Sequence, residues 1–288
     1  MRQEHQLKQI DTLDSRQFFI AVRRLADTLS YGSDSSRFLG SGIEYVQSRI
    51  YHYGDPIRTI DWRVTARTAK VHVKEHEAPK RIPCYLLIDT SASMTISSTK
   101  RSKYATAVHI AGGLAFACLD RISPVGIVAV GDRELRVEPN LSKLMIMQWL
   151  LQLRRFRYDE GTNLARRVAQ LTPSLKSRCL VIVLSDMHDD TAVDALKLLG
   201  QAHDIVALQL MDPAELGVRG AGFLRATEAE TGKEFVSLGR QVWLDQDALE
   251  TGLRRGGIDH LVIRTDEPFA HKLRHYFVSR NLFGRGAR

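Results

Sequence analysis

The side chains of this sequence that are best suited to chemistry carry oxygen and follow two apolar segments. The run Tyr85-Leu86-Leu87-Ile88 is followed by Asp89-Thr90-Ser91-Ala92-Ser93, and the run that ends at Leu184 is followed by Ser185-Asp186. A third polar stretch, Gly161-Thr162-Asn163, lies between them in the sequence. These stretches present two carboxylates and three hydroxyls, an all-oxygen donor set that suits a hard cation such as Mg²⁺ rather than zinc or copper. The sequence therefore predicts a divalent-cation site, with Mg²⁺ favoured and Mn²⁺ or Ca²⁺ as alternatives.

A site of this kind leaves room for a ligand from another molecule. Mg²⁺ takes six ligands near an octahedron and tends to keep waters, so three hydroxyls and two carboxylates leave at least one position open. Where the carboxylates act through water, the cation stays electron-poor and favours a carboxylate from a partner. We therefore expect a docking point rather than a closed structural site.

Enzymes are the competing class. A phosphatase of the Asp-x-Asp type also places an aspartate after a buried strand, but position 91 is Ser, so the acid that protonates a leaving group is missing. Ser91 as a nucleophile with His188 as base is a second possibility, although the chain lacks the Gly-x-Ser-x-Gly turn. A metal-assisted hydrolase of phosphoesters or peptides is thus the alternative to a non-enzymatic function.

Alternating strands and helices must position these residues from about residue 82 onward. Wholly apolar runs at 85–88 and 179–184 are typical of strands buried on both faces, and 102–119 is predicted to be a long helix. The alternation continues with strands at 125–130, 135–137, 204–211 and 261–263, a hairpin within 223–238, and helices at 141–153, 163–171, 192–202, 242–253 and 269–278. This order predicts an α/β fold with a doubly wound, mostly parallel sheet flanked by helices. Ligands of such sheets bind beyond the carboxyl ends of the strands, where the three polar stretches would converge.

The first part of the chain has a different pattern. Asp14 is expected to cap a helix that carries Phe18 and Val22 on one face, and β-like runs follow at 43–53 and 68–77. Trp62 is predicted to pack in the core of this module, with a contact to the sheet domain as the alternative. We therefore expect three parts: a helix and small β-rich module at 1–80, the sheet domain with the metal site at 81–265, and a C-terminal helix packed on that domain at 266–288.

Composition narrows the class of protein. The chain of 288 residues is 44% hydrophobic and 26% charged, so it can build a sizeable core and is not a disordered chain. Its three cysteines are widely spaced among apolar residues, which excludes a disulfide scaffold and favours a reducing compartment. The start has no signal-peptide core, and no run approaches the ~18 apolar residues of a membrane span. We expect a cytoplasmic protein without a membrane span.

The net charge of +8 belongs to the middle of the chain. Residues 81–180 carry 15 basic and 7 acidic side chains, whereas residues 181–288 carry 13 and 16. Arg154, Arg155 and Arg157 precede Thr162, and we expect them, together with His188, to contact an acidic partner. A nucleic-acid-binding module that uses this basic patch is an alternative, but neither stacking aromatics nor a reader motif accompanies it. Exposed arginines without a role are a third interpretation.

At the predicted cation site the chain resembles the von Willebrand factor A domain. Asp89-x-Ser91-x-Ser93, then Thr162, then Asp186 match the metal-ion-dependent adhesion site of that domain in its order, and the resemblance covers roughly residues 82–265. It implies that the hydroxyls of Ser91, Ser93 and Thr162 contact the metal. It also implies that Asp89 and Asp186 bind the metal directly or through water.

Three further stretches narrow the resemblance to a prokaryotic subgroup of these proteins, the family called domain of unknown function 58. They are Gly40-Ser41-Gly42-Ile43-Glu44, Tyr53-Gly54-Asp55-Pro56-Ile57-Arg58-Thr59-Ile60-Asp61-Trp62 and Asp212-Pro213-Ala214-Glu215. This resemblance implies a non-enzymatic partner of MoxR-type AAA+ ATPases in chaperone-like or complex-assembly tasks. We therefore expect a Mg²⁺-dependent adaptor whose metal site is completed by a carboxylate of the ATPase or of an acidic client protein.

Overall fold

The chain divides into two compact units. The computed structural model describes residues 5–6, 44–55, 57–77, 82–120, 122–189, 191–216, 223–227, 234–238 and 244–280. Ser33–Arg81 form one unit, and Met1–Gly32 together with Ile82–Arg288 form the other. The larger unit holds every residue of the predicted cation site. The helix predicted to begin at Asp14 lies outside the described residues.

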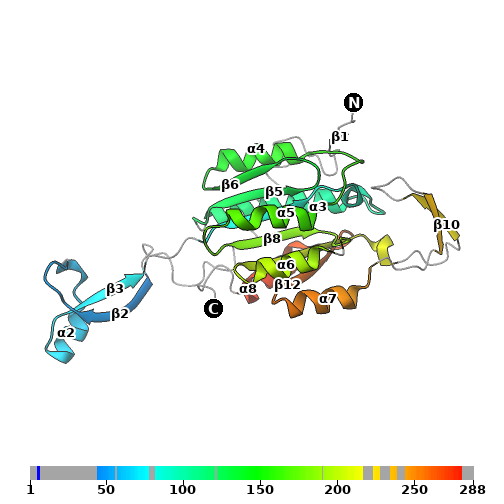
Figure 1. Cartoon of the computed structure of the whole chain (residues 1–288). Coiled ribbons are helices and arrows are strands. Elements are labelled where there is room, and N and C mark those ends of the chain that lie inside the picture. The colour runs from blue at the N-terminus through cyan, green and yellow to red at the C-terminus, as the bar shows by residue number, and fades with distance from the viewer. Residues whose placement is uncertain are drawn as a thin grey trace. The chain divides into compact units, whose positions relative to one another are not determined.

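The larger unit is built around a six-stranded sheet with the strand order β12-β9-β8-β4-β5-β6 (Figure 1). Neighbouring strands are parallel except for β6, which runs antiparallel to β5. The strands are β4 (Cys84–Asp89), β5 (Val125–Val130), β6 (Arg136–Asn140), β8 (Leu180–Ser185), β9 (Asp204–Met211) and β12 (Asp259–Arg264). The mixed α/β fold and the mostly parallel sheet that the sequence predicts are confirmed.

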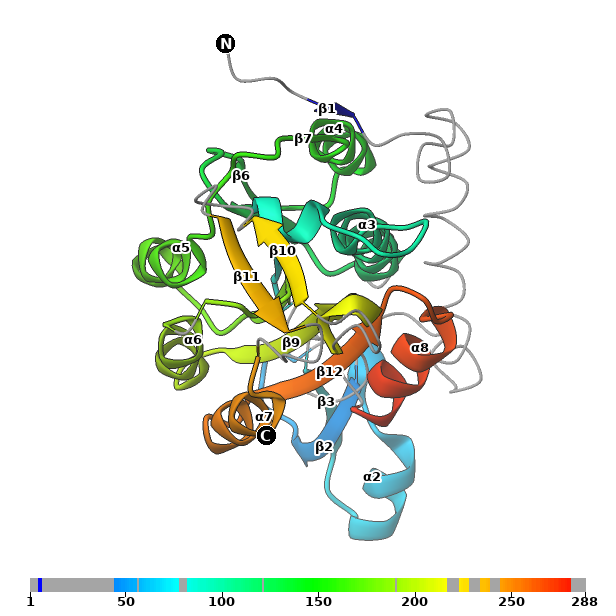
Figure 2. The same cartoon turned by 90° about the vertical axis from the view of Figure 1, so that its right-hand side faces the viewer.

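Helices cover both faces of this sheet (Figure 2). One face packs against α3 (Lys103–Asp120), α4 (Lys143–Leu153) and α8 (Ala270–Ser279). The other packs against α5 (Leu164–Leu171), α6 (Ala192–Gly200) and α7 (Gln246–Arg255). Because β4, β5 and β8 are covered on both sides, every residue in them is buried, which explains their continuous apolar sequences.

The helix α3 is the most deeply buried of these helices. Fifteen of its 18 residues are buried, and its sequence from Tyr104 to Cys118 contains no Lys, Arg, Asp or Glu. Lys103, the first residue of the helix, is also buried. A buried charge requires a partner, so this lysine must be paired.

The strand β6 forms an irregular edge of the sheet. Its register with β5 shifts between Val125 and Ile127. Gly126 of β5 faces this irregularity, and a Cβ atom there would lie 2.8 Å from the carbonyl oxygen of Val137, so the close approach of the two strands requires glycine. Arg136 and Glu138 on β6 are exposed.

Two short antiparallel pairs accompany the sheet in the larger unit. β1 (His5–Gln6) pairs with β7 (Arg155–Phe156), directly after α4. β10 (Phe223–Thr227) pairs with β11 (Glu234–Leu238), which confirms the predicted hairpin. Among the described residues, no helix combines the length and the apolar character needed to cross a membrane.

The smaller unit contains an antiparallel pair of strands and a short helix. β2 (Glu44–Ile50) pairs with β3 (His72–Glu77), and α2 (Trp62–Thr68) lies between them in the sequence. The sequence interpretation missed α2, which begins where the Asp61 carboxylate accepts hydrogen bonds from the backbone of Arg63 and Val64. The prediction that Trp62 packs in the core is wrong: its side chain is 67% exposed, because it occupies the first position of this helix and faces outward.

Candidate metal centre

The neighbouring ends of β4 and β8 bring two buried aspartates to one edge of the sheet. Asp89 is the last residue of β4, and Asp186 directly follows β8; both are buried. Between them, the Ser185 hydroxyl donates a hydrogen bond of 2.6 Å to Oδ2 of Asp89. The parallel register of the two strands therefore places the first and last residues of the predicted site together.

The loop after β4 adds the two serines. The Ser91 amide donates to Oδ1 of Asp89 at 3.0 Å, and the hydroxyls of Ser91 and Ser93 lie 3.0 Å apart. Among the described residues, the Ser91 hydroxyl is paired with the Ser93 hydroxyl, and no histidine nitrogen forms a hydrogen bond with it. The two hydroxyls thus form a paired polar group beside the Asp89 carboxylate.

The third polar stretch is attached to this loop through its backbone. The Ala92 amide donates to the carbonyl oxygen of Glu160 at 2.7 Å, two residues before Thr162. Asp132 accepts hydrogen bonds from the Gly161 amide at 3.3 Å and the Asn163 side chain at 3.0 Å. Thr162 is half-buried between these neighbours, on the segment that the Ala92–Glu160 hydrogen bond ties to the loop after β4.

A buried lysine completes the surroundings of Asp186. Lys103 Nζ donates to Oδ2 of Asp186 at 2.8 Å and also pairs with Glu215, which lies in the 3-10 helix Pro213–Leu216. His188 Nε2 lies 3.8 Å from Oε1 of the same glutamate. One ligand atom each from Asp186, His188 and Glu215 falls within 4.8 Å of the others. The Lys103 ammonium is thus the cation that the structure places between the two carboxylates.

One oxygen of this cluster stands out. Among the described residues, Oδ1 of Asp186 is buried and has no hydrogen-bond partner. Leaving a buried carboxylate oxygen unsatisfied is costly, more so than for a neutral group. A divalent cation would satisfy this atom, and the oxygen donors around it are of the type that Mg²⁺ prefers. The residues present therefore fit the predicted ion.

The two aspartates have opposite pKa shifts. Burial, and then the nearby Asp186 carboxylate, raise the pKa of Asp89 to about 7, although hydrogen bonds from Ser185 and Ser91 oppose the shift. Burial would also raise the pKa of Asp186, but the charges of Lys103 and His188 outweigh it and hold that pKa below its usual value. Asp186 is therefore the permanent anion of the pair, and Asp89 is the one whose charge depends on its surroundings.

Backbone strain marks the same loop. Met187 has a φ of 62°, a left-handed conformation that costs a non-glycine residue roughly 1–3 kcal/mol. Its side chain is buried and its amide donates to Ser185 Oγ at 3.0 Å, so packing and this hydrogen bond maintain the turn. The strained turn directs the chain from Asp186 towards His188.

Comparison with known sequences gives the family. The sequence profile of the family described as "Protein of unknown function DUF58" matches residues 47–245, more than half of the chain. The chain belongs to the DUF58 family. Among its relatives are an uncharacterized protein of Mycobacterium bovis and one of Mycobacterium tuberculosis. Each is 24% identical over 218 residues, which cover 74% of this chain and 69% of the relative.

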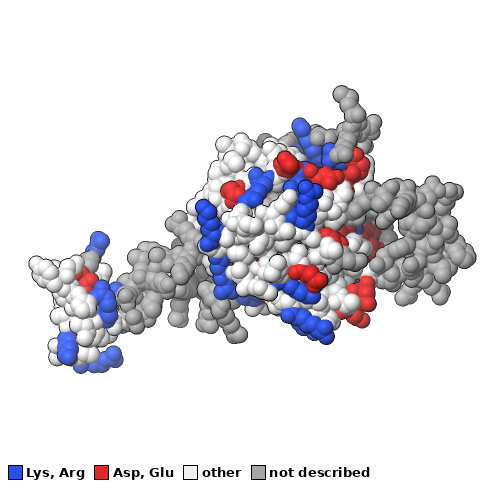
Figure 3. Space-filling view, viewed as in Figure 1, with Lys and Arg blue, Asp and Glu red and all other residues white. Residues whose placement is uncertain are grey.

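The residues predicted to contact a partner do not form one uniformly exposed basic patch in this DUF58 member. Arg155 is exposed, whereas Arg154 and Arg157 are half-buried, and Arg157 lies 3.9 Å from the Asp159 carboxylate. His188 is an exposed residue, and its imidazole Nε2 faces Oε1 of Glu215 at 3.8 Å. Figure 3 shows basic side chains dispersed over the visible face of the larger unit, with acidic ones between them.

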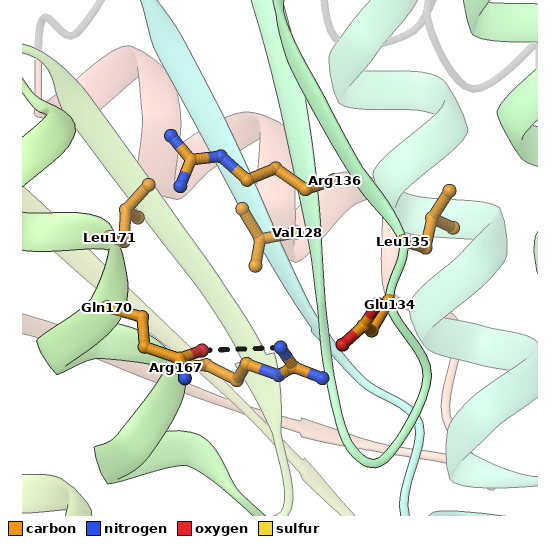
Figure 4. A pocket seen from close by; sticks show the side chains of 7 residues that line it. All are labelled: Val128, Glu134, Leu135, Arg136, Arg167, Gln170 and Leu171. Atoms are coloured by element: carbon orange, nitrogen blue, oxygen red, sulfur yellow. Dashed lines mark hydrogen bonds between the residues drawn. The ribbon is translucent and has the colours of Figure 1, made fainter.

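A surface pocket of the DUF58 chain lies away from these residues. It is lined by Val128, Glu134, Leu135, Arg136, Arg167, Gln170 and Leu171 (Figure 4). The Arg167 guanidinium is engaged by the Gly131 carbonyl oxygen and by Gln170. The pocket contains none of the predicted site residues.

Sequence reasoning missed three residues of this site: Ser185 as the link to Asp89, Lys103 and Glu215. The sequence carries a signal for one of them, because the charged Lys103 directly precedes a run, 104–118, that contains no Lys, Arg, Asp or Glu. Glu215 lies in one of the stretches that suggested the DUF58 family, but nothing in its neighbourhood indicates that it pairs with a residue 112 positions away.

Proposed function

We propose that this DUF58 chain is a non-enzymatic, Mg²⁺-dependent protein-binding adaptor whose metal site is completed by a carboxylate of its partner. The observation that carries the proposal is the buried, unpartnered Oδ1 of Asp186, which lies in a cluster with Asp89 and the Ser91–Ser93 hydroxyl pair. A cation would satisfy this buried oxygen. Because the site supplies only two carboxylates, a bound divalent cation could accept a further carboxylate from a partner.

The proposed ligands are the five residues of the adhesion-site pattern: Asp89, Ser91, Ser93, Thr162 and Asp186. The strand order and the position of the site at the carboxyl edge of the sheet support its likeness to the von Willebrand factor A domain. A bound Mg²⁺ would supply an electrophilic position for an incoming carboxylate oxygen. The chain's own residues orient the donors: Ser185 and the Ser91 amide fix the Asp89 carboxylate, and Lys103 fixes that of Asp186.

The contacts of Ser91 favour binding over catalysis. A nucleophilic serine needs a base within hydrogen-bond reach. Ser91 Oγ lies beside Ser93 Oγ, and His188 lies beside Glu215. The second acid of an Asp-x-Asp phosphatase is absent, because position 91 is serine. The adaptor therefore uses its hydroxyls as metal ligands in our proposal.

The partner we propose is an AAA+ ATPase of the MoxR type, with an acidic client protein as a second one. This part of the proposal rests on the family resemblance. An acidic segment would supply the carboxylate that the metal lacks, and Arg155 is an exposed cation on the chain segment that leads to the Thr162 loop.

Calorimetric titration with Mg²⁺ tests the metal site. We expect one site in the wild type and an affinity at least ~10-fold weaker in Asp186→Asn and in Ser91→Ala, because each loses a direct or water-mediated ligand. Asp194→Asn is the matched control, since it removes one exposed carboxylate from α6 and should bind like the wild type. Unchanged affinity in both site variants would overturn the proposed metal site.

Capture of the purified ATPase tests the adaptor function. We expect binding with Mg²⁺ and its loss with a chelator or with Asp186→Asn. Binding that is unchanged by the chelator would mean that the ATPase contacts a surface other than the metal site. Hydrolysis of generic phosphoesters that disappears in Asp89→Ala would favour the hydrolase instead.

A further inference from the structure

We propose that Lys103 is a built-in counter-ion of the metal centre: it holds the site together without the divalent cation and weakens the affinity for that cation. This inference rests on the proposed Mg²⁺ site. It assigns to a residue outside the adhesion-site pattern the role of setting how tightly the metal is held.

The position of Lys103 is fixed by α3, the most buried of the helices that cover the sheet. Its side chain is 3% exposed, and it begins α3, in which 15 of 18 residues are buried. An ammonium group in such a place is held by its partners, because it has little access to water. Its partners are the carboxylates of Asp186 and Glu215.

These two carboxylates come from loops after adjacent strands. Asp186 follows β8, and Glu215 lies in the 3-10 helix after β9. Glu215 is itself held, because the Asp212 amide donates to its Oε2 at 3.3 Å. Lys103 therefore links the ends of β8 and β9, and its loss would leave the two carboxylates close together without their buried cation, with His188 as the remaining basic group beside them.

Lys103 also decides which oxygen of Asp186 is available. Lys103 Nζ donates a hydrogen bond to Oδ2 of Asp186 at 2.8 Å. Oδ1 of the same carboxylate is buried and has no hydrogen-bond partner among the described residues. The lysine thus orients the carboxylate so that one oxygen is left for a metal. The same positive charge, one carboxylate away, repels a divalent cation. Positioning and repulsion together would give a site that is assembled in advance but binds its metal weakly enough to exchange it.

The two effects have opposite signs in one variant. In Lys103→Met we expect the metal-free protein to melt at a lower temperature, because Asp186 and Glu215 lose their cation. We expect its affinity for Mg²⁺, measured by calorimetry, to rise about tenfold, because the repulsion is gone. Lys197→Met is the matched control: it removes the same charge from an exposed pair with Asp194 and should change neither quantity. An unchanged or weaker affinity in Lys103→Met would overturn the inference.

A second variant decides the question if Lys103→Met does not fold. In Glu215→Gln, Lys103 keeps Asp186 as its carboxylate partner but loses Glu215, so its positive charge is less neutralised. We therefore expect Mg²⁺ to bind several-fold more weakly. Unchanged or tighter binding in Glu215→Gln would contradict the inference. A wild type that binds no Mg²⁺ would instead overturn the proposed function itself, so the two failures are distinguishable.

Discussion

The hydroxyl of Ser185 donates a hydrogen bond of 2.6 Å to Oδ2 of Asp89, 96 positions earlier in the sequence. The hydroxyl oxygen of Ser185 in turn accepts the amide hydrogen of Met187 at 3.0 Å. One small side chain therefore connects the end of β4, the end of β8 and the strained turn that follows Asp186.

Replacing Ser185 by alanine should destabilise the protein. Both the Asp89 carboxylate and the Met187 amide would lose a buried partner, at a cost of about 1–3 kcal/mol in the free energy of unfolding. Urea unfolding of the metal-free protein measures this change. Ser279→Ala, which removes an exposed hydroxyl bonded to the Tyr276 carbonyl, is the control with a small effect. Equal losses in both variants would show that Ser185 does not link the two strands energetically.

The contribution of Asp89 to the stability of the metal-free protein should fall as the pH rises from about 4 to about 7. The pKa of Asp89 is raised from 3.8 to about 7 in the folded state, by burial and then by Asp186. Within that window the folded chain keeps a proton that the unfolded chain has released, so each step upward in pH favours unfolding. The lowered pKa of Asp186 acts in the opposite sense, but only below its usual value and thus outside this window.

Asp89→Asn isolates this contribution. Since the amide does not titrate, the difference in unfolding free energy between variant and wild type should change steadily from pH 4 to 7 and become constant above it. Unfolding curves in a chelator at several pH values measure the difference. A difference that is independent of pH would mean that Asp89 titrates normally. Because His188 is present in both proteins, its raised pKa should largely cancel in the comparison.

Two glycines near the site should respond differently to alanine. A Cβ atom on Gly131 would lie far too close to the Thr90 hydroxyl and would also meet Oε1 of Glu160 at 2.5 Å, whereas one on Gly161 would meet nothing within 4 Å. We expect Gly131→Ala to cost about 1–3 kcal/mol through overpacking and Gly161→Ala to leave the unfolding free energy nearly unchanged. Thermal unfolding of the two variants side by side checks this. A tolerated alanine at position 131 would contradict the close packing around Thr90.

The buried Glu160 should stabilise the fold of the loop that leads to Thr162. Its carboxylate accepts hydrogen bonds from Thr90 at 2.5 Å and from Arg133 Nε at 2.9 Å, and it is fully buried. Glu160→Gln should lower the unfolding free energy by about 3–5 kcal/mol, because it leaves Arg133 without its anion. The double variant with Arg133→Met should recover part of this loss, which a double-mutant cycle measures. Additive losses would argue against a coupled pair.

The sequence predicts much of the larger unit because its signals are local. Continuous apolar runs such as 179–184 identify strands buried on both faces, and the polar residues that follow them mark the edge where a site forms. The helix α2 escaped prediction because it has only seven residues and its apolar side chains alternate with arginine or threonine, a pattern typical of a strand. The Lys103–Glu215 pair could not be predicted, since it depends on which loops the folded sheet brings together rather than on any pattern along the chain.

The irregular edge strand β6 has a consequence for assembly. An exposed sheet edge is a template on which a strand of another molecule can be added, and proteins counter this with bulges, proline and charged side chains. β6 combines a shifted register, Pro139, and the exposed Arg136 and Glu138 within five residues. These features disfavour the addition of a strand from another molecule to β6. We therefore expect that copies of this domain do not pair through this edge, even at high local concentration.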